Sequence, residues 1–273
     1  MNMKGPMVEL RAILLPLFSL WFRLKRGEAV LIVVNTSWAW FLHSDNLSLV
    51  FAISLFSTLV LAQLYGLNDV IDAEKDLNDP DKVNNWAGLI HKQKGRYLFI
   101  SILWAIALLL LAGILFNPEV ISITVAMILI NTLYSLVFKS IPVIDIIWVI
   151  LWGMCFLALT GFATEWLEYY LVIGLMTGIS HVWQILRDKH ADNENSIKTT
   201  ANLSIGIALV LVSICCLVLA FVVFRLSNVF LALACMLPMV IYRVENRIRH
   251  VWVYSKIVFG LIWLYLLYGL YTP

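Results

Sequence analysis

The sequence Asn68-Asp69-Val70-Ile71-Asp72-Ala73-Glu74-Lys75-Asp76 directly follows an apolar run that covers residues 47–67. A run of about 20 apolar residues is long enough to cross the ~30 Å hydrocarbon core of a bilayer as an α-helix. Charged side chains at the end of such a helix are costly to place, so they are functional candidates by default. The junction therefore predicts a membrane-spanning helix that presents carboxylates at one membrane face.

The rest of the chain repeats this apolar pattern. Of the 273 residues, 62% are hydrophobic and 13% are charged, whereas about 25% charged residues is usual in a soluble domain. The mean hydropathy is +0.91. Nine apolar segments cover residues 28–42, 47–67, 97–116, 120–138, 143–164, 167–186, 202–224, 226–242 and 252–271. Because these runs are continuously apolar and do not alternate with polar residues, they predict helices and not barrel strands.

The composition thus predicts an all-α, polytopic membrane protein, with nine transmembrane helices in one bundle around a central cavity. No linker rich in Gly, Ser or Pro divides the chain, so we expect a single membrane domain over residues 1–273. The net charge of +2 is small, and nothing in it points to a nucleic-acid partner. The expected surroundings are the lipid bilayer of a cell membrane, the inner or plasma membrane in a prokaryote.

The distribution of basic residues predicts the orientation. If the N-terminus lies in the cytoplasm, all nineteen Lys and Arg residues except Arg225 fall in cytoplasmic segments. Since cytoplasmic loops are enriched in Lys and Arg, we expect a cytoplasmic N-terminus and an external C-terminus. Both acidic loops, at about residues 68–96 and 187–202, then face the cytoplasm. Residues 8–22 are apolar, but Pro16 and the basic cluster after them favour an interfacial helix over a further span.

The first acidic cluster has helical spacing. Asn68, Asp72 and Asp76 are four residues apart and share one helix face, and Asp69 lies beside that face. A single Asp in such a place would more simply cap the helix in a solvated loop. Two such rows at equivalent places in the topology would instead favour a binding site.

The end of the sixth apolar segment repeats this spacing with Gln184, Asp188 and Asp192. Four spans separate the two rows, so both rows reach the same membrane face. Mg²⁺ binds one or two carboxylates and completes its shell with waters and substrate phosphate oxygens. Two rows that face each other across a cavity can therefore hold Mg²⁺ ions that bridge to a diphosphate. The expected metal ligands are Asn68, Asp72, Asp76, Asp188 and Asp192, and Asp69 joins them as a catalytic candidate.

Two further sets of polar residues lie near the rows. Basic side chains would neutralise the remaining charge of a phosphorylated substrate, and the candidates are Lys82, Lys139, Lys189 and Lys198. Polar side chains within the spans could orient a second substrate or act as a base; these are Tyr65, Asn131, Tyr134, His181 and Gln184. Each of these could equally form a hydrogen bond between helices.

Three stretches resemble signature sequences of the UbiA superfamily of intramembrane prenyltransferases. The first is the Asn-Asp-x-x-Asp-x-x-x-Asp pattern of residues 68–76. The second is Asp188-x-x-x-Asp192, followed by Ser196-Ile197-Lys198-Thr199 and Gly206. The third is Tyr-Ser-Leu-Val-Phe-Lys-Ser-Ile-Pro at residues 134–142, followed by Asp145 and Gly161. The resemblance covers about residues 20–270, and the pair of acidic motifs in one chain is far more specific than either motif alone.

This resemblance implies a Mg²⁺-dependent enzyme that ionises an isoprenyl diphosphate and transfers the prenyl group to an aromatic or other small acceptor. Mg²⁺ and basic side chains would stabilise the departing diphosphate while the allylic C–O bond breaks. An apolar cavity lined by aromatic residues would keep water from the cation. The chain departs from the family pattern at Asn85, where a phosphate-binding Arg is common, and at Ser196, which replaces the usual Gly.

Three other functions fit parts of the pattern. A terpene cyclase of the same superfamily would quench the cation with the donor's own double bonds. The form Asn-Asp-x-x-Asp-x-Glu-x-Asp, with Pro80 and Lys82 after it, also resembles the branch that transfers phosphoribose to polyprenyl phosphate. A transporter or an inactive scaffold is the non-enzymatic alternative. Transporters place their sites near the bilayer midplane on broken helices, whereas these acids gather at one membrane face.

Overall fold

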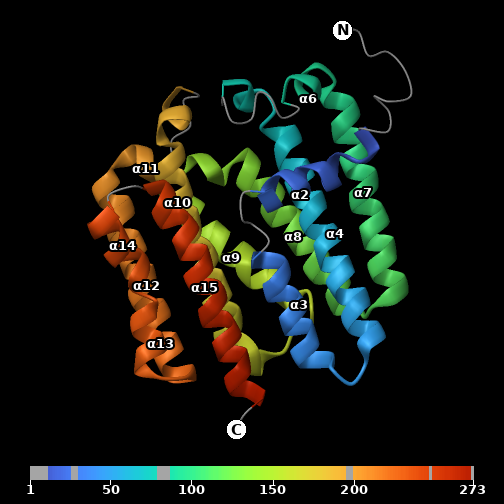
Figure 1. Ribbon diagram of the computed structural model, residues 1–273. Helices are drawn as coiled ribbons and strands as arrows, with labels where there is room; N and C mark the ends of the chain where they lie inside the picture. The colour runs from blue at the N-terminus through green and yellow to red at the C-terminus, as the bar shows by residue number, and fades with distance from the viewer. Residues whose placement is uncertain (1–11, 26–29, 79–86, 195–198, 246–247, 272–273) are drawn as a thin grey trace.

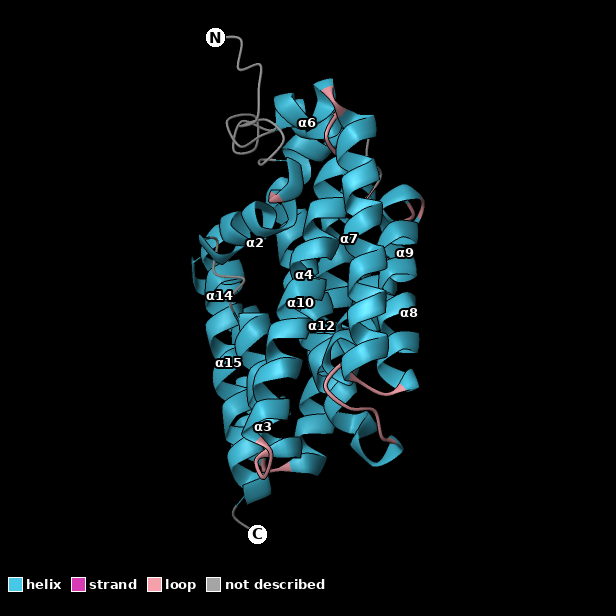
Figure 2. Cartoon of the chain, turned by 90° about the vertical axis from the view of Figure 1, so that its right-hand side faces the viewer, coloured by secondary structure: helices cyan, strands magenta, loops and turns pink. Residues whose placement is uncertain are grey.

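The computed structural model describes residues 12–25, 30–78, 87–194, 199–245 and 248–271 (Figure 1). Within these ranges the chain is helical, with short connections and no strand (Figure 2). The α-helices are α2 (Leu15–Lys25), α3 (Val30–His43), α4 (Leu47–Ile71), α6 (Gly88–Lys92), α7 (Lys94–Leu115), α8 (Pro118–Leu136), α9 (Ile144–Ala158), α10 (Leu167–Glu194), α11 (Thr200–Leu203), α12 (Ile205–Leu226), α13 (Val229–Ala234), α14 (Leu237–Glu245) and α15 (Ile248–Tyr271). Short 3₁₀ turns are η1 (Lys75–Asn78), η3 (Phe138–Ser140) and η4 (Thr164–Trp166). The all-α prediction is confirmed.

Six helices of the described chain are long and apolar enough to cross a membrane. They are Leu47–Ile71, Lys94–Leu115, Pro118–Leu136, Thr164–Lys189, Ile205–Leu226 and His250–Tyr271. The other three expected spans correspond to shorter apolar segments, Val30–His43, Ile144–Ala158 and Val229–Arg243. At 1.5 Å per residue, a helix of 14 or 15 residues covers only about 21–23 Å.

The last of these short segments is divided into two helices. α13 ends at Ala234 and α14 begins at Leu237, so Cys235 and Met236 form a turn between them. Pro238 follows in the first turn of α14, where its missing N–H costs nothing because that donor has no helical partner. The eighth apolar run is therefore helical at both ends and interrupted in the middle.

The bundle is organised around α10. An apolar stretch of 18 residues was compared in each long helix. In α10, 72% of this stretch is buried, whereas in α7, at the edge of the bundle, 17% is buried. α10 packs against α9, α12 and α15 (Figure 1). The largest apolar cluster runs along α10 and includes Ile179, Val182 and Trp183. The helix that carries the second acidic row is thus the most enclosed of the six long apolar helices in the described chain.

Glycines allow α9 and α10 to pack closely. A Cβ atom on Gly174 would lie 2.7 Å from the carbonyl oxygen of Ile150, and one on Gly178 would lie 2.5 Å from Cγ1 of the same residue. On the facing helix, a Cβ on Gly153 would lie 2.7 Å from Oγ1 of Thr177. Small residues let helix backbones approach in membranes, where van der Waals packing drives association. The spacing between α9 and α10 therefore depends on these glycines.

The helix α2 covers part of the expected interfacial segment and lies across α4 rather than along it (Figures 1 and 2). Its buried side includes Leu15 and Pro16, while Trp21 is exposed. A Cβ on Gly66 of α4 would lie 3.1 Å from Cα of Pro16, so the two helices touch at their backbones. Residues 8–11, the start of the expected helix, lie outside the described residues.

Candidate functional site

The first acidic row forms at the end of α4. The helix ends at Ile71, and Asp72 is its C-cap, with the Asp72 N–H donating to the Asn68 carbonyl at 2.9 Å. The Asp76 N–H donates in the same way to the Asp72 carbonyl at 2.9 Å. The backbone therefore keeps a helical step beyond the helix end, and the predicted row is preserved. Asp72 is only 1% exposed, and Asp76 is also buried.

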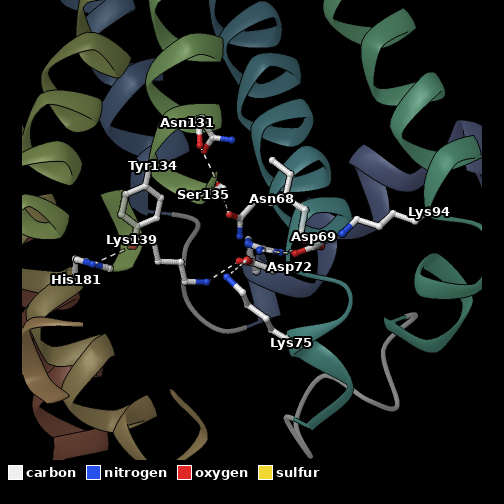
Figure 3. A network of polar contacts seen from close by, with 12 residues as sticks. Asn68, Asp69, Asp72, Lys75, Lys94, Asn131, Tyr134, Ser135, Lys139 and His181 are labelled. Carbon is white, nitrogen blue, oxygen red and sulfur yellow. Dashed lines mark hydrogen bonds and ion pairs between the residues drawn. The ribbon is translucent and has the colours of Figure 1, made fainter. Parts of the chain in front are cut away.

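A matching row that begins on α8 and ends in η3 faces the row on α4. Asn131, Ser135 and Lys139 are four residues apart, and each binds the residue that is 67 positions earlier. The Asn131 amide donates to the Leu64 carbonyl at 3.1 Å, and the Ser135 hydroxyl donates to Asn68 Oδ1 at 2.7 Å. We call these contacts and the Lys139–Asp72 ion pair the α4–α8 ladder (Figure 3). Its constant offset shows that the two helices run parallel in register.

The last rung of the ladder is an ion pair. Lys139 Nζ lies 2.6 Å from Asp72 Oδ2, and Lys75 Nζ lies 3.8 Å from Asp72 Oδ1. A buried carboxylate is strongly disfavoured unless cations and hydrogen bonds offset the loss of hydration. Lys139 supplies this compensation from η3, immediately after α8. Three charged side chains therefore lie close together at the end of the ladder, and these are Asp72, Lys139 and Lys75.

A second polar contact joins α8 to α10. Tyr134 Oη lies 3.2 Å from Nε2 of His181, and the two rings meet edge to face with centroids 5.8 Å apart. Figure 3 shows this pair beside Lys139 and Asp72. The structure therefore brings together six residues from α4 and its C-cap, α8, η3 and α10, which are Asn68, Asp72, Asn131, Tyr134, Lys139 and His181.

Asp145 anchors the chain that follows the second acidic row. It is completely buried, and its carboxylate accepts hydrogen bonds from the Ile146 N–H at 2.9 Å and from the N–H and hydroxyl of Thr200 at 3.0 and 2.5 Å. The Thr200 hydroxyl oxygen accepts in turn from the Val143 N–H at 2.6 Å. Val143 has a φ of +71°, which is strained for a β-branched residue. The start of α9 and the start of α11 are thereby fixed to each other.

The second row lies within α10, because this helix continues to Glu194. The expected loop over residues 187–202 therefore begins as helix. Asp188 forms a bidentate ion pair with the neighbouring Arg187 at 2.6 and 2.8 Å. Gln184 and Lys189 are half-buried on the same helix. The side chain of Asp192 and the residues Lys82, Asn85, Ser196 and Lys198 lie outside the described part of the structure.

Asp69 is not part of the ladder, because its carboxylate is paired with a residue of α2. Arg23 of α2 binds both Asp69 oxygens, at 2.7 and 3.1 Å, and stacks over the ring of Tyr65 with Cζ 4.4 Å from the centroid. Arg23 was not predicted as a site residue, since nothing in the spacing links it to an acid 46 residues later. The roles of Ser135 and Thr200 were not predicted either. Ser135 could have been found, because it shares the four-residue spacing of Asn131 and Lys139.

The donor set is suited to a hard divalent cation. Among the residues that the structure describes, no three His, Cys, Asp or Glu side chains converge on one point. Mg²⁺ does not require such a cage, because one or two carboxylates suffice when phosphate oxygens and waters complete the shell. Asp72 and Asp76 are buried acids in one row, and the Asn68 amide oxygen adds a third oxygen donor. The first row therefore fits part of a magnesium shell.

Comparisons with known proteins identify the fold. Solved structures of a UbiA homolog from Archaeoglobus fulgidus have the same fold. The forms bound to DMAPP and Mg²⁺ and to GPP and Mg²⁺ each match with a TM-score of 0.64 and 15% identity, over 91% of this chain and 99% of that chain. The form bound to Cd²⁺ matches with a TM-score of 0.63 and 16% identity, over 91% and 98%. No curated protein matches the sequence.

The family model of the UbiA prenyltransferases matches residues 29–252, which is most of the chain and includes every rung of the ladder and the second acidic row. The chain belongs to the UbiA prenyltransferase family.

Proposed function

We propose that this protein is a Mg²⁺-dependent intramembrane prenyltransferase, which ionises an isoprenyl diphosphate and transfers the prenyl group to an aromatic or other small acceptor. The observation that carries the proposal is the α4–α8 ladder, which ends in the buried Asp72 and the ammonium of Lys139. The bound DMAPP, GPP and Mg²⁺ of the A. fulgidus homolog support the same donor class and metal for this chain.

In this proposal the two rows hold the metal between them. The ligands are Asn68, Asp72, Asp76, Asp188 and Asp192. Bound Mg²⁺ would act as a Lewis acid toward the leaving diphosphate. Lys139, together with Lys82, Lys189 and Lys198, would supply positive charge to the phosphate oxygens. Ser135 keeps the Asn68 amide oxygen in place, and Asp69 holds α2 through Arg23 rather than taking part in the chemistry.

The site is completed by polar groups deeper in the bundle. Tyr65, Asn131, Tyr134, His181 and Gln184 are the candidates for contact with substrate. Tyr134 and His181 lie against each other between α8 and α10, next to the end of the ladder. Asn131 has its amide committed to the Leu64 carbonyl, so its role is to join the helices. This leaves the Tyr134–His181 pair as the group best placed for the acceptor.

We further propose one domain over residues 1–273 with nine spans, a cytoplasmic N-terminus and an external C-terminus. The three shorter apolar segments would be the additional spans. Of the nineteen basic residues, only Arg225 falls on the external side in this topology. Figure 1 supports it, since α2 and α6 lie near one end of the bundle and α15 ends at the other. The active site would then face the cytoplasm.

The test is diphosphate release by the purified protein. With Mg²⁺ and geranyl diphosphate we expect turnover that is abolished by EDTA and restored by Mg²⁺. Asp72→Asn and Asp188→Asn should each lower the rate by about 100-fold or more, since each removes charge that stabilises the leaving group. Asp45→Asn, in an exposed turn, is the matched control and should retain full activity. Equal rates in all three variants would reject the site.

The same assay separates the alternatives. A cyclase would release diphosphate and give a cyclic hydrocarbon or alcohol without consuming an acceptor. A phosphoribosyltransferase would release diphosphate from phosphoribosyl diphosphate in the presence of a polyprenyl phosphate, and not from geranyl diphosphate. An inactive scaffold or a transporter would release none from either compound. Mass spectrometry of the organic products identifies which reaction takes place.

A further inference from the structure

Two cations from different helices meet on the ring of Trp252 in α15. The Nζ of Lys256 lies 3.5 Å from the centroid of this ring, and the Cζ of Arg187 in α10 lies 4.2 Å from it. Trp252 is buried, while the side chain of Arg187 is 23% exposed. Because the face of an indole attracts cations, the ring gathers two positive charges between the neighbouring helices α10 and α15 (Figure 1). We call these three residues the α10–α15 basic cluster.

The place of Lys256 in α15 sets it apart from the basic residues of the loops. It lies eight residues after the start of α15, about 12 Å along the helix, within a segment that is long and apolar enough to cross a membrane. An ionisable residue in such a segment is a functional candidate by default. Its ammonium reaches back over Trp252, which precedes it by one turn, as a snorkelling lysine does. The charge is thereby carried toward the level of the lipid headgroups.

The bias of basic residues toward cytoplasmic loops does not account for this cluster. That bias requires only that Lys and Arg lie in the loops. Lys256 and Arg187 instead lie within α-helices, and their side chains converge on one ring. Like charges repel more strongly where the dielectric is low. An arrangement that holds two of them together at a membrane face is therefore suited to an anion.

The surroundings of the cluster are basic on one side and apolar on the other. In the sequence, residues 243–256 contain four Lys or Arg residues and one acid, Glu245. Val253 and Ile257, on either side of Lys256, are exposed on a helix that can cross a membrane, so this side of α15 faces acyl chains. Basic pockets between transmembrane helices near the cytoplasmic face suit the headgroups of anionic lipids. Charge and position together fit a ligand that carries both a phosphate and acyl chains.

We propose that the α10–α15 basic cluster binds the phosphate of an anionic phospholipid, and that this contact draws Arg187 away from Asp188. A guanidinium and an ammonium both donate charge-assisted hydrogen bonds to phosphate oxygens. Arg187 donates to both oxygens of Asp188, at 2.6 and 2.8 Å. A phosphate that takes over this guanidinium leaves more of the negative charge of Asp188 for a divalent cation. The link to Asp188 rests on the proposed function, in which Asp188 is a metal ligand.

The position of the cluster favours a phospholipid over the prenyl donor. Arg187 faces Trp252 of α15, whereas His181, on the same face of α10 as Asp188, contacts Tyr134 of α8. Successive residues of an α-helix point about 100° apart, so Arg187 and Asp188 face different neighbours. The cluster thus lies outside the space between the two acidic rows, where the diphosphate of the donor is proposed to bind.

Native mass spectrometry of the full-length protein in a neutral detergent tests the binding. The protein is titrated with phosphatidylglycerol and, separately, with phosphatidylcholine that has the same acyl chains. We expect one phosphatidylglycerol to bind about fivefold or more tightly than phosphatidylcholine, which is the effect of one basic residue near an anionic headgroup. Lys256→Gln should remove most of this preference. Lys256→Arg keeps the charge and should keep the preference.

A matched control lies at the opposite end of α10. Arg225 pairs with Glu168, in the first turn of α10, at 2.9 Å, and Arg225→Gln should keep the wild-type preference for phosphatidylglycerol. Equal affinity of the wild type for the two lipids, or an unchanged preference in Lys256→Gln, would overturn the lipid site. Displacement of phosphatidylglycerol by geranyl diphosphate or by inorganic phosphate at equal concentration would also overturn it, because the cluster would then be a site for soluble phosphates.

Binding of Mn²⁺, a paramagnetic substitute for Mg²⁺, tests the link to Asp188 by electron paramagnetic resonance. The protein is placed in phosphatidylcholine vesicles with and without phosphatidylglycerol. We expect phosphatidylglycerol to lower the dissociation constant for Mn²⁺ severalfold more in the wild type than in Lys256→Gln. The change in the variant measures the general attraction of cations to an anionic surface. Equal changes in the two proteins would overturn the link.

The two measurements separate this inference from the proposed function. A wild type that binds no Mn²⁺ in either membrane refutes the metal site and the link to it, while the mass spectra still decide the lipid site. A wild type that binds Mn²⁺ but shows no preference for phosphatidylglycerol keeps the metal site and overturns the lipid site.

Discussion

Arg23 shows how one residue outside the matched family region contributes to the site. It lies on α2, before residue 29 where the family match begins. Its guanidinium binds both oxygens of Asp69 and covers the ring of Tyr65, and both partners belong to the last turns of α4. A planar guanidinium can make this bidentate and stacked contact, whereas an ammonium cannot. The contact fixes α2 to the helix that carries the first acidic row.

A double-mutant cycle tests this contact. Arg23→Met and Asp69→Asn should show a coupling of roughly 1–3 kcal/mol in thermal unfolding of the detergent-solubilised protein, because both side chains are mostly shielded from water. Lys25→Met is the control, because Lys25 contacts only the exposed Trp21 among the contacts described. Additive effects within about 0.5 kcal/mol would mean that the pair does not hold α2.

Substitution of Lys139 is a sharper test of the ladder. Lys139→Met keeps most of the side-chain volume but leaves the buried Asp72 without its closest cation. Removal of one partner of a buried pair is more damaging than removal of both. We therefore expect Lys139→Met to lower diphosphate release by about tenfold or more, and the protein to lose stability as well. Lys92→Met, in the exposed end of α6, should do neither.

At the scale of elements, the α9–α10 contact is the tightest in the core. The Cβ positions at Gly174 and Gly178 are already occupied by Ile150, and that of Gly153 by Thr177. A larger residue there must push α9 away from α10. Because Asp145 lies in the first turn of α9 and α10 carries His181, such a shift would also reach the site.

Gly174→Val should destabilise the folded protein by about 1–3 kcal/mol, the usual range for overpacking of a well-packed core. The midpoint of thermal unfolding in detergent measures it. Gly269→Ala is the matched control, because a Cβ at that position of α15 meets nothing within 4 Å. If both variants unfold at the wild-type temperature, the close approach of α9 and α10 does not contribute to the stability of the folded protein.

At the scale of the whole molecule, the basic residues predict which end of the bundle faces the cytoplasm. In the proposed topology, single cysteines at exposed Ser227, near Arg225, and at Gln93, beside the first acidic loop, should differ in labelling. In right-side-out membrane vesicles, a membrane-impermeant maleimide should label the first and not the second. The four native cysteines are buried or half-buried, and the unsubstituted protein measures their background. The reverse pattern would invert the proposed topology.

The amount that the sequence could predict differs between these scales. Apolar runs predicted the helices because membrane crossing depends on length and hydrophobicity alone. The row Asn68, Asp72 and Asp76 was predictable because its order is set by helical pitch within one segment. The α8 row that faces it was only partly recognised: Lys139 and Asn131 were selected singly, and Ser135 was passed over. Their shared spacing becomes meaningful only when α4 and α8 are known to be parallel neighbours.

Contacts between distant segments could not be predicted. Packing decides where distant elements lie relative to one another, and a single sequence carries no local pattern for it. The contacts of Arg23 with Asp69 and of Asp145 with Thr200 are of this kind. The interruption between α13 and α14 was also missed, because Pro238 in an apolar run is compatible with either a kink or a break. The roles of Asp188 and Asp192 remain predictions.

The length of α10 has a consequence for the lipid around the protein. Its 28 residues extend for about 42 Å, well beyond the ~30 Å of hydrocarbon. A thicker bilayer would draw the Asp188 end of this rod into the acyl layer, and a thinner one would push it farther into water. Turnover in reconstituted vesicles should therefore peak at one acyl-chain length and fall on either side. The thickness of the bilayer would thus regulate the rate of the reaction.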